Sequence, residues 1–404
     1  MAIHIVIVGG SFGGLPAAFE LRHHLDPDQV KITLISKNSR FVFIPSLPWV
    51  AIGRRNVDEI SFALAPVLAR KYVDFVCDSV ERIDAAKKTV STGAGDYRYD
   101  FLVVATGHRS ANEKVPGLGP FDGPGHSLMS APEAEELNEA IAHLLHQPGP
   151  VVVAAAPGAS CIGPAYEFAF EIDHLLRRRR LRHQVPITFV TPEPFLGHMG
   201  MGGAGAIRQM LEGALDERDI PYQTSAAVTG IGVDAVEVAG SGSIPSALSM
   251  VIPPLAGVAA VANSPGLANP NGFVPVDERY RHPDADGVYA IGVATAMPPV
   301  APTPVPVNFP KTGDMTEQMA TVAAADIVAR ITGGEATVAE LRARCVMDMG
   351  DEGIYMSVDP VRPPRDTIPT ISKGRRWLWA KRAFERTYLF TARHGRRVPT
   401  ALGW

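Results

Sequence analysis

Cysteine, aromatic residues and long apolar runs are all scarce in this chain. Its 404 residues include three cysteines, and aromatic residues make up 7% of the total. Three thiols are too few for a disulfide framework, so the fold must depend on a hydrophobic core, for which 46% hydrophobic residues are ample. The longest apolar run, residues 250–262, contains Pro253 and Pro254. It is shorter than the roughly 20 residues that cross a bilayer, so any membrane contact is predicted to be monotopic.

An excess of positive charge and a targeting segment are missing as well. The net charge of -4 argues against a bulk nucleic-acid binder. Because the chain opens directly in a strand-like run, Ile3 to Val8, we expect no cleavable signal peptide. The sequence shows no metal-ligand pattern, so no metal site is predicted. The length suggests two or three domains.

A glycine-rich turn follows the first predicted strand. Residues 9–14 read Gly-Gly-Ser-Phe-Gly-Gly and precede a predicted helix over 15–21, with a second strand over 31–35. This order is typical of a dinucleotide-binding unit, in which a pyrophosphate sits at the helix N-terminus. Ser11 stands at the middle glycine of the pattern, and Ser36 stands where a ribose-binding acid is usual. The motif alone is weak.

Three later segments strengthen this interpretation. Residues 99–107 form an apolar strand that ends in Ala-Thr-Gly, and residues 287–292 form a late strand that ends in Gly292. Both are typical of flavoproteins with two dinucleotide-binding domains, although most of these carry Asp where Val293 stands here. A second strand-turn-helix unit starts at residues 150–155, and its turn lacks the glycines that would seat NAD.

Two cysteines lie at informative places. Cys161 is inside the second turn, within residues 158–167, and Cys345 lies in residues 345–350. A turn at a helix start favours thiolate, so the pair suggests a flavoenzyme that acts on sulfur. Cys77 falls in an apolar, strand-like run and is predicted to be an inert core residue.

On these motifs the chain resembles the sulfide:quinone oxidoreductases, nearly end to end. The cysteine-bearing turn is specific, whereas the Rossmann glycines are not, and Ser36 is what the family shows. The matching segments are residues 34–38, 43–50, 115–117, 158–167, 197–198, 310–313, 345–353 and 379–385.

The resemblance implies a reaction in which sulfide gives two electrons to FAD, sulfur leaves as zero-valent sulfur, and a quinone is reduced. Cys161 and Cys345 match the cysteines that flank the flavin and are bridged by sulfur, with their individual roles left open. Glu167 is the candidate for proton transfer. His198 is either a proton donor or a buried structural imidazole. Trp49 either covers the flavin or belongs to the core.

The resemblance also implies cofactor and quinone sites. Val346, Lys381 and Phe384 are expected near the quinone. The residues expected at FAD are Gly9, Ser11, Phe12, Gly13, Gly14, Ser36, Lys37, Pro45, Ala105, Thr106, Gly107, Gly292, Val293, Lys311, Thr312 and Gly313. Lys311 and the helix start after it would stabilise negative charge on the reduced flavin. Because Met129 and Glu133 replace a family cysteine and histidine, FAD is predicted to be non-covalent.

The carboxy-terminal segment is strongly basic from residue 373 onward. At helical spacing its arginines fall on one stripe, namely Arg375, Arg382, Arg386 and Arg393. Trp377, Ala380, Phe384 and Tyr388 fall on the opposite side. This pattern predicts a helix anchored on anionic lipid at the cell (inner) membrane, its face left open. The alternative is that the aromatic side chains pack on the core.

The sequence therefore predicts an α/β fold with two Rossmann-like dinucleotide-binding domains and a C-terminal amphipathic, membrane-associating module. The FAD-binding domain is expected over residues 1–110 and 270–334, the second domain over 111–269, and the module over 335–404. Expected partners are sulfide, quinone, a small thiol or other sulfur acceptor, and lipid, but no nucleic acid; a homo-oligomer stays open.

Four other functions fit the sequence less well. A type II NADH:quinone dehydrogenase would need an intact NAD turn and neither Cys161 nor Cys345. A flavocytochrome-type sulfide dehydrogenase would carry an export signal, and a pyridine-nucleotide disulfide reductase needs a closely spaced cysteine pair. A non-catalytic flavin- or lipid-binding protein would have no reason to keep both separated thiols.

Overall fold

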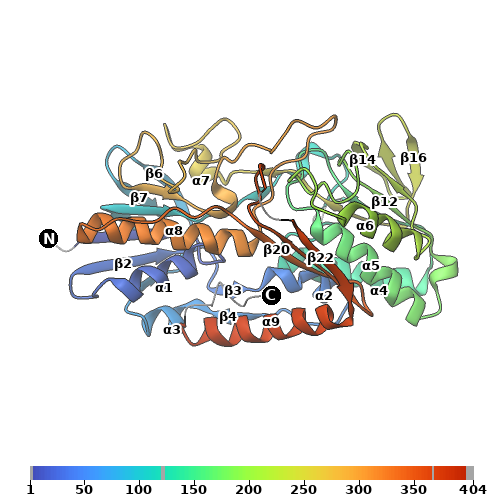
Figure 1. The fold of residues 1–404 in the computed structure, drawn as a ribbon, viewed down its shortest axis with the longest axis horizontal. Helices are drawn as coiled ribbons and strands as arrows, with labels where there is room; N and C mark the ends of the chain where they lie inside the picture. Colours follow the sequence, from blue (N-terminus) through green and yellow to red (C-terminus); the bar gives the residue numbers. More distant parts are fainter. Residues whose placement is uncertain (1–2, 120–122, 366–367, 397–404) are drawn as a thin grey trace.

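The computed structural model describes residues 3–119, 123–365 and 368–396. Figure 1 shows two α/β units at opposite ends of an elongated molecule, one built from the blue and orange segments and one from the green. The red C-terminal strands and helix extend from one unit to the other. The predicted fold class thus has its two Rossmann-like units.

The first sheet is parallel throughout, in the order β19-β9-β1-β2-β5. Its strands are β1 (Ile3–Val8), β2 (Val30–Ile35), β5 (Asp74–Val76), β9 (Phe101–Val104) and β19 (Val288–Ala290). Strands covered on both faces are nearly continuous apolar runs, as β1 is from Ile5 to Val8. Helices α1 (Gly14–His24) and α8 (Gly313–Thr332) pack against each other beside this sheet. The glycine-rich turn therefore lies between β1 and α1, as predicted.

The second sheet repeats this plan with four parallel strands in the order β13-β12-β11-β17. They are β11 (Val151–Ala155), β12 (Ile187–Val190), β13 (Tyr222–Gln223) and β17 (Leu248–Ile252). Helix α5 (Gly163–Arg178) packs on β11, β12 and β17. The strand-turn-helix unit predicted from residue 150 is thus present, and Cys161 lies in the turn just before α5.

Shorter elements complete the two units. The helices are α2 (Leu47–Ala51), α3 (Leu64–Ala69), α4 (Ala131–His146), α6 (Ile207–Asp216) and α7 (Ala259–Ala262). The antiparallel strands are β3 (Arg40–Val42), β4 (Ser61–Ala63), β6 (Val80–Asp84), β7 (Thr89–Thr92), β8 (Gly95–Arg98), β10 (Arg109–Ser110), β14 (Val228–Ile231), β15 (Ala235–Val238), β16 (Gly242–Pro245) and β18 (Leu255–Ala256).

The C-terminal part is an antiparallel sheet followed by a helix. It consists of β20 (Ala343–Asp348), β21 (Gly353–Val358), β22 (Thr370–Gly374) and α9 (Arg375–Arg393). Strand β20 packs against α5, and α9 packs against β20 and β21. This packing brings Cys345, on β20, to the helix that follows Cys161.

The burial of Cys77 and Trp49 decides whether each belongs to the core. Cys77 is exposed, because strand β5 ends at Val76 before reaching it; its assignment to the core was wrong. Trp49 is a core residue with 2% of its surface exposed, and its Nε1 donates to Asp348 at 2.8 Å.

The aromatic stripe of α9 faces the protein. Tyr388 is buried against Phe12, Phe41 and Phe43, with ring centroids 5.0–5.8 Å apart, and Trp377 stacks on Tyr355 at 4.2 Å. Core packing therefore accounts for these side chains, as the alternative held. The exposed aromatic residues of α9 are instead Trp379 and Phe390, at 65% and 55% exposure. Within the described ranges, no helix is both long and apolar enough to cross a bilayer.

Candidate active site

The turn between β1 and α1 forms a cradle that only glycine can build. Gly9 has φ +111°, and a Cβ there would lie 2.2 Å from the carbonyl oxygen of Ala105. A Cβ on Gly14 would lie 1.8 Å from the carbonyl oxygen of Gly9. Nearby, the hydroxyl of Thr106 is buried without a hydrogen-bond partner among the described residues. A bare helix N-terminus beside an orphaned polar group fits the pyrophosphate of a dinucleotide.

Basic side chains gather beside this cradle. Burial, with the charges of Lys311 and Lys37, lowers the pKa of His108 to about 4. The Nζ of Lys311 donates to the carbonyl of Thr295 at 2.8 Å, and burial lowers its pKa to about 8. A buried ammonium with a depressed pKa favours an anionic neighbour, which a reduced flavin would supply.

Other predicted FAD residues meet at the start of α8. Thr312 caps this helix by accepting from the backbone N–H of Met315 at 3.3 Å. A Cβ on Gly313 would lie 2.9 Å from the ring of Phe12, so the two segments touch. At the end of β19, a Cβ on Gly292 would lie 2.6 Å from Thr316. Residues far apart in sequence thus line one continuous surface.

The remaining predicted FAD residues lie at the edge of this surface. The buried Ser36 hydroxyl, at the end of β2, donates to the carbonyl of Asn38 at 3.0 Å. Lys37 is exposed, and Pro45 lies in a short 3-10 helix, Ile44–Ser46.

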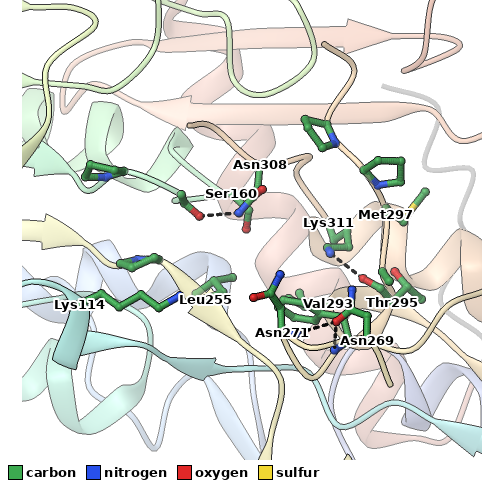
Figure 2. Close-up of a pocket in the computed structure, with 17 residues that line it drawn as sticks. Lys114, Ser160, Leu255, Asn269, Asn271, Val293, Thr295, Met297, Asn308 and Lys311 are labelled. Carbon is green, nitrogen blue, oxygen red and sulfur yellow. Dashed lines mark hydrogen bonds between the residues drawn. The ribbon is translucent and has the colours of Figure 1, made fainter. Parts of the chain in front are cut away.

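A cavity of about 380 Å³ connects this surface with the second unit. Figure 2 shows Val293, Lys311 and Thr295 on one side and Ser160 with Asn308 on the other. The Nδ2 of Asn308 donates to the carbonyl of Gly158 at 2.8 Å and so ties down the turn that carries the cysteine. The space therefore opens directly beside the segment that holds Cys161.

The two half-buried thiols are distant in sequence, but the docking of β20 on α5 brings them near enough for the charge of one to be felt by the other. Burial raises the pKa of Cys161 to about 11 and that of Cys345 to about 12, and the shift of Cys345 includes contributions from Cys161 and Glu167. Desolvation of the charged form is the main cause, so the structure favours the neutral thiols, against the expectation that the helix start would favour thiolate. Neither cysteine forms a disulfide within the described chain.

A buried ion pair lies beside the thiols. Lys381 of α9 donates to Glu167 of α5, and both side chains are 7% exposed. Burial raises the pKa of Glu167 to about 7, against the opposite effect of Lys381. The residue predicted for proton transfer thus contacts one predicted for the quinone site. A carboxyl that titrates near neutral pH is suited to exchange protons with a substrate.

The other two predicted quinone residues are placed differently. Phe384 lies on the inner side of α9, with its ring centroid 5.6 Å from that of Phe43. Val346 pairs with Tyr355 in the sheet and, by strand alternation, faces away from its neighbour Cys345. Phe384 and Lys381 therefore share α9, whereas Val346 shares a face of the sheet with Tyr355, which stacks on Trp377 of the same helix.

Comparisons with known proteins agree with this geometry. A family model described as pyridine nucleotide-disulphide oxidoreductase matches residues 3–326. The sulfide-quinone reductase of Aquifex aeolicus (strain VF5) is 39% identical over 409 residues, covering 99% of this chain and 93% of the relative. The chain belongs to the sulfide:quinone oxidoreductase family. The X-ray structure of the Aquifex aeolicus sulfide:quinone oxidoreductase superposes with a TM-score of 0.94 at 37% identity, over 98% of this chain and 93% of that one.

Two further proteins show weaker similarity to this chain. The mitochondrial sulfide:quinone oxidoreductase of Dictyostelium discoideum is 27% identical over 73% of this chain and 66% of its own length. The NDH2 structure from Plasmodium falciparum, in complex with NADH, has a TM-score of 0.73 at 14% identity over 98% of this chain and 96% of its own, which shows a shared fold alone.

His198, the remaining family residue, makes structural contacts. It is buried, its Nδ1 accepts from the backbone N–H of Gly200 at 3.3 Å, and its ring lies 5.3 Å from that of Phe195. Burial lowers its pKa, which favours the neutral imidazole. These contacts fit the structural role, and the proton-donor role stays a prediction.

Sequence reasoning missed several buried charged residues around the sulfide:quinone oxidoreductase site. Asp348 is fully buried and accepts from Arg54 at 3.0 Å. Glu171 is fully buried one turn after Glu167 on α5. Burial raises the pKa of Glu317 on α8 to about 8. The spacing of Glu167 and Glu171 at i and i+4 was a readable signal, whereas Asp348 and Glu317 depend on tertiary packing.

Proposed function

We propose that this protein oxidises sulfide by two electrons to zero-valent sulfur and passes the electrons to a quinone. The single observation that carries the proposal is the nearness of Cys345 to Cys161, the residue that follows Ser160 in the lining of the cavity shared with Val293 and Lys311. FAD, held in the cradle of β1 and α1, would supply the two-electron chemistry. The two thiols would hold the sulfur atom between them and release it to a small thiol or other acceptor.

The charged groups near the thiols would handle the proton transfers of the reaction. Because burial raises the pKa of both thiols, their deprotonation needs a nearby base, and Glu167 is placed for it. Lys381 holds the Glu167 carboxylate and belongs to the same helix as Phe384. Proton exchange on the sulfur side and the predicted quinone side would thus share one ion pair.

The deciding experiment follows the flavin absorbance. Under anaerobic conditions sulfide should bleach the flavin, and a soluble quinone should then restore its colour. NADH is the matched alternative donor, since a type II NADH:quinone dehydrogenase would be bleached by NADH instead. Rapid bleaching by NADH without bleaching by sulfide would rule out the proposed function.

We propose that FAD is held without a covalent bond. The position of the family cysteine is occupied by Met129, whose backbone N–H donates to the buried Glu133 carboxylate at 2.8 Å. Neither side chain forms a thioether with a flavin. We expect acid denaturation and filtration to release all the flavin as free FAD. Flavin retained with the precipitated protein would contradict this.

We also propose that α9 lies on an anionic membrane surface. Its exposed side carries Trp379 and Phe390 beside the exposed Arg375 and Arg386, and the guanidinium of Arg382 lies 5.4 Å from the Trp379 ring. Aromatic side chains flanked by arginines are suited to the headgroup region of anionic lipid.

Replacing Trp379 and Phe390 together by alanine is therefore expected to weaken binding to anionic vesicles by at least about tenfold, because two apolar side chains lose their burial in the interface. Co-sedimentation with phosphatidylglycerol vesicles measures the effect. Trp377→Phe is the matched control, since Trp377 is half-buried and stacks on Tyr355, so its variant should bind normally. Equal binding by all three proteins would show that α9 does not contact lipid.

A further inference from the structure

We propose that Glu171 relays protons between the buried Glu167–Lys381 pair and solvent near His174. This inference rests on the proposed function, because it assigns a proton route to that reaction. Glu167, Glu171 and His174 follow one another at i, i+4 and i+7 along α5. Side chains at this spacing lie one above another on a single face of a helix. The row begins near the thiols and ends at a half-buried imidazole.

Glu171 is buried without a hydrogen bond among the described residues. Its side chain is fully buried, and neither carboxyl oxygen has a hydrogen-bond partner within the described ranges. A guanidinium nitrogen of Arg54 lies 3.7 Å from its Oε1, but that same nitrogen donates to Asp348 at 3.0 Å. Leaving such a polar group buried and unsatisfied costs about 1–3 kcal/mol. An uncommitted carboxyl of this kind is free to accept and donate a proton.

The charges around Glu171 keep it protonated at rest. The groups that face it are Glu167 on its own helix, Asp348 from β20, Lys381 from α9 and Arg54 from the segment after α2. Burial, together with the two carboxylates, raises its pKa well above the usual value, against the effect of the two cations. It therefore stores a proton next to the Glu167–Lys381 pair, and it passes that proton on when the pair loses one and is then reprotonated from outside.

The other end of the row reaches solvent. Gly350 packs so closely on His174 that a Cβ there would lie 2.2 Å from the ring. Burial and the charge of Arg54 lower the pKa of His174, so the ring is neutral and can pass protons through its two nitrogens. An open hollow of about 360 Å³ lined by Arg54 and Arg178 lies on the same side.

The stoichiometry of the reaction requires such a route. Reduction of a quinone to hydroquinone takes two electrons and two protons. Hydrosulfide, HS⁻, supplies both electrons but only one proton as it becomes zero-valent sulfur. The second proton must come from solvent, and the row would deliver it by way of Glu167 to Lys381. The relay thus serves the quinone half of the cycle and not the sulfide half.

The test uses the holoenzyme with Glu171→Gln, which keeps the size of the side chain but cannot exchange a proton. Stopped-flow absorbance should show bleaching by sulfide within about twofold of wild type, and reoxidation by a soluble quinone slowed about 10²-fold, the lower range for a lost acid–base group. Imidazole in the buffer should restore much of the reoxidation rate, which a purely structural defect would not allow. His174→Gln should slow the same step less.

The controls separate this inference from the proposed function. Glu193→Gln is a matched variant, because Glu193 is a buried acid that is fully hydrogen-bonded to Tyr166, Thr191 and Met199 and should not affect quinone reduction. Unchanged reoxidation in Glu171→Gln, slowing of both half-reactions, or slowing that imidazole does not relieve would each overturn the relay. Failure of wild type to bleach with sulfide would instead overturn the proposed function.

Discussion

Replacing either Cys161 or Cys345 by serine is expected to reduce sulfide-dependent flavin bleaching by at least about 10³-fold, because a hydroxyl cannot form the sulfur–sulfur bonds of the proposed reaction. The flavin should stay bound, since the cradle around Gly9 and Gly14 is separate from the thiols. Anaerobic stopped-flow absorbance measures the rate, and the ratio of flavin to protein absorbance measures occupancy.

The exposed Cys77 provides the matched control for this experiment. Cys77→Ser removes a thiol from the same protein without touching either sulfur-holding position, so its bleaching rate should equal that of wild type. A wild-type rate in Cys161→Ser or Cys345→Ser would show that the sulfur is not held between these two residues.

Replacing Lys381 by methionine is expected to lower the free energy of unfolding by about 3–5 kcal/mol above pH 7, because it leaves the Glu167 carboxylate buried and unpaired. The loss should be smaller at pH 5. Burial raises the pKa of Glu167 from 4.5 to about 7 even though Lys381 lowers it, so in the variant this pKa rises further. A raised pKa in the folded protein stabilises the fold at low pH, and this contribution is lost as pH rises through that pKa. Urea unfolding at pH 5 and pH 8 measures both values.

The double variant Glu167→Gln, Lys381→Met tests the cause. It removes both charges, so it should be more stable at pH 8 than Lys381→Met alone. Flavin reoxidation by quinone should nevertheless stay impaired, because the predicted proton donor is absent. If the single and double variants unfold at the same urea concentration at pH 8, the buried charge is not the source of the instability.

Local sequence patterns predicted the first strand, the glycine-rich turn and the second strand-turn-helix unit. The strand and turn up to Gly14 follow from apolar residues and glycines, and both are found where expected. The second unit at residue 150 follows from the same signals. The cradle needs glycine at Gly9 and Gly14 because backbone atoms occupy the space of a side chain. Such steric requirements are visible in sequence.

Long-range packing set the features that the local patterns did not reveal. Helical periodicity separated two faces of α9 correctly but could not say which face the core would cover; the rings of Phe41 and Phe43 decide it by packing on Tyr388. Cys77 was assigned to the core because its strand was expected to continue past Val76. The pairing of Cys161 with Cys345 rested on family resemblance, since only the docking of β20 on α5 brings the two together.

The C-terminal strands and α9 carry both Cys345 and Lys381. The glycine turn between β1 and α1 and the start of α8 precede this segment in the chain, but Phe12 of the turn packs on Tyr388 of α9. A newly made polypeptide whose last segment has not yet docked would thus lack one of the two sulfur-holding thiols and the ring that packs on Phe12. Such an immature enzyme could not accept electrons from sulfide. It would therefore form no reduced flavin that oxygen could reoxidise.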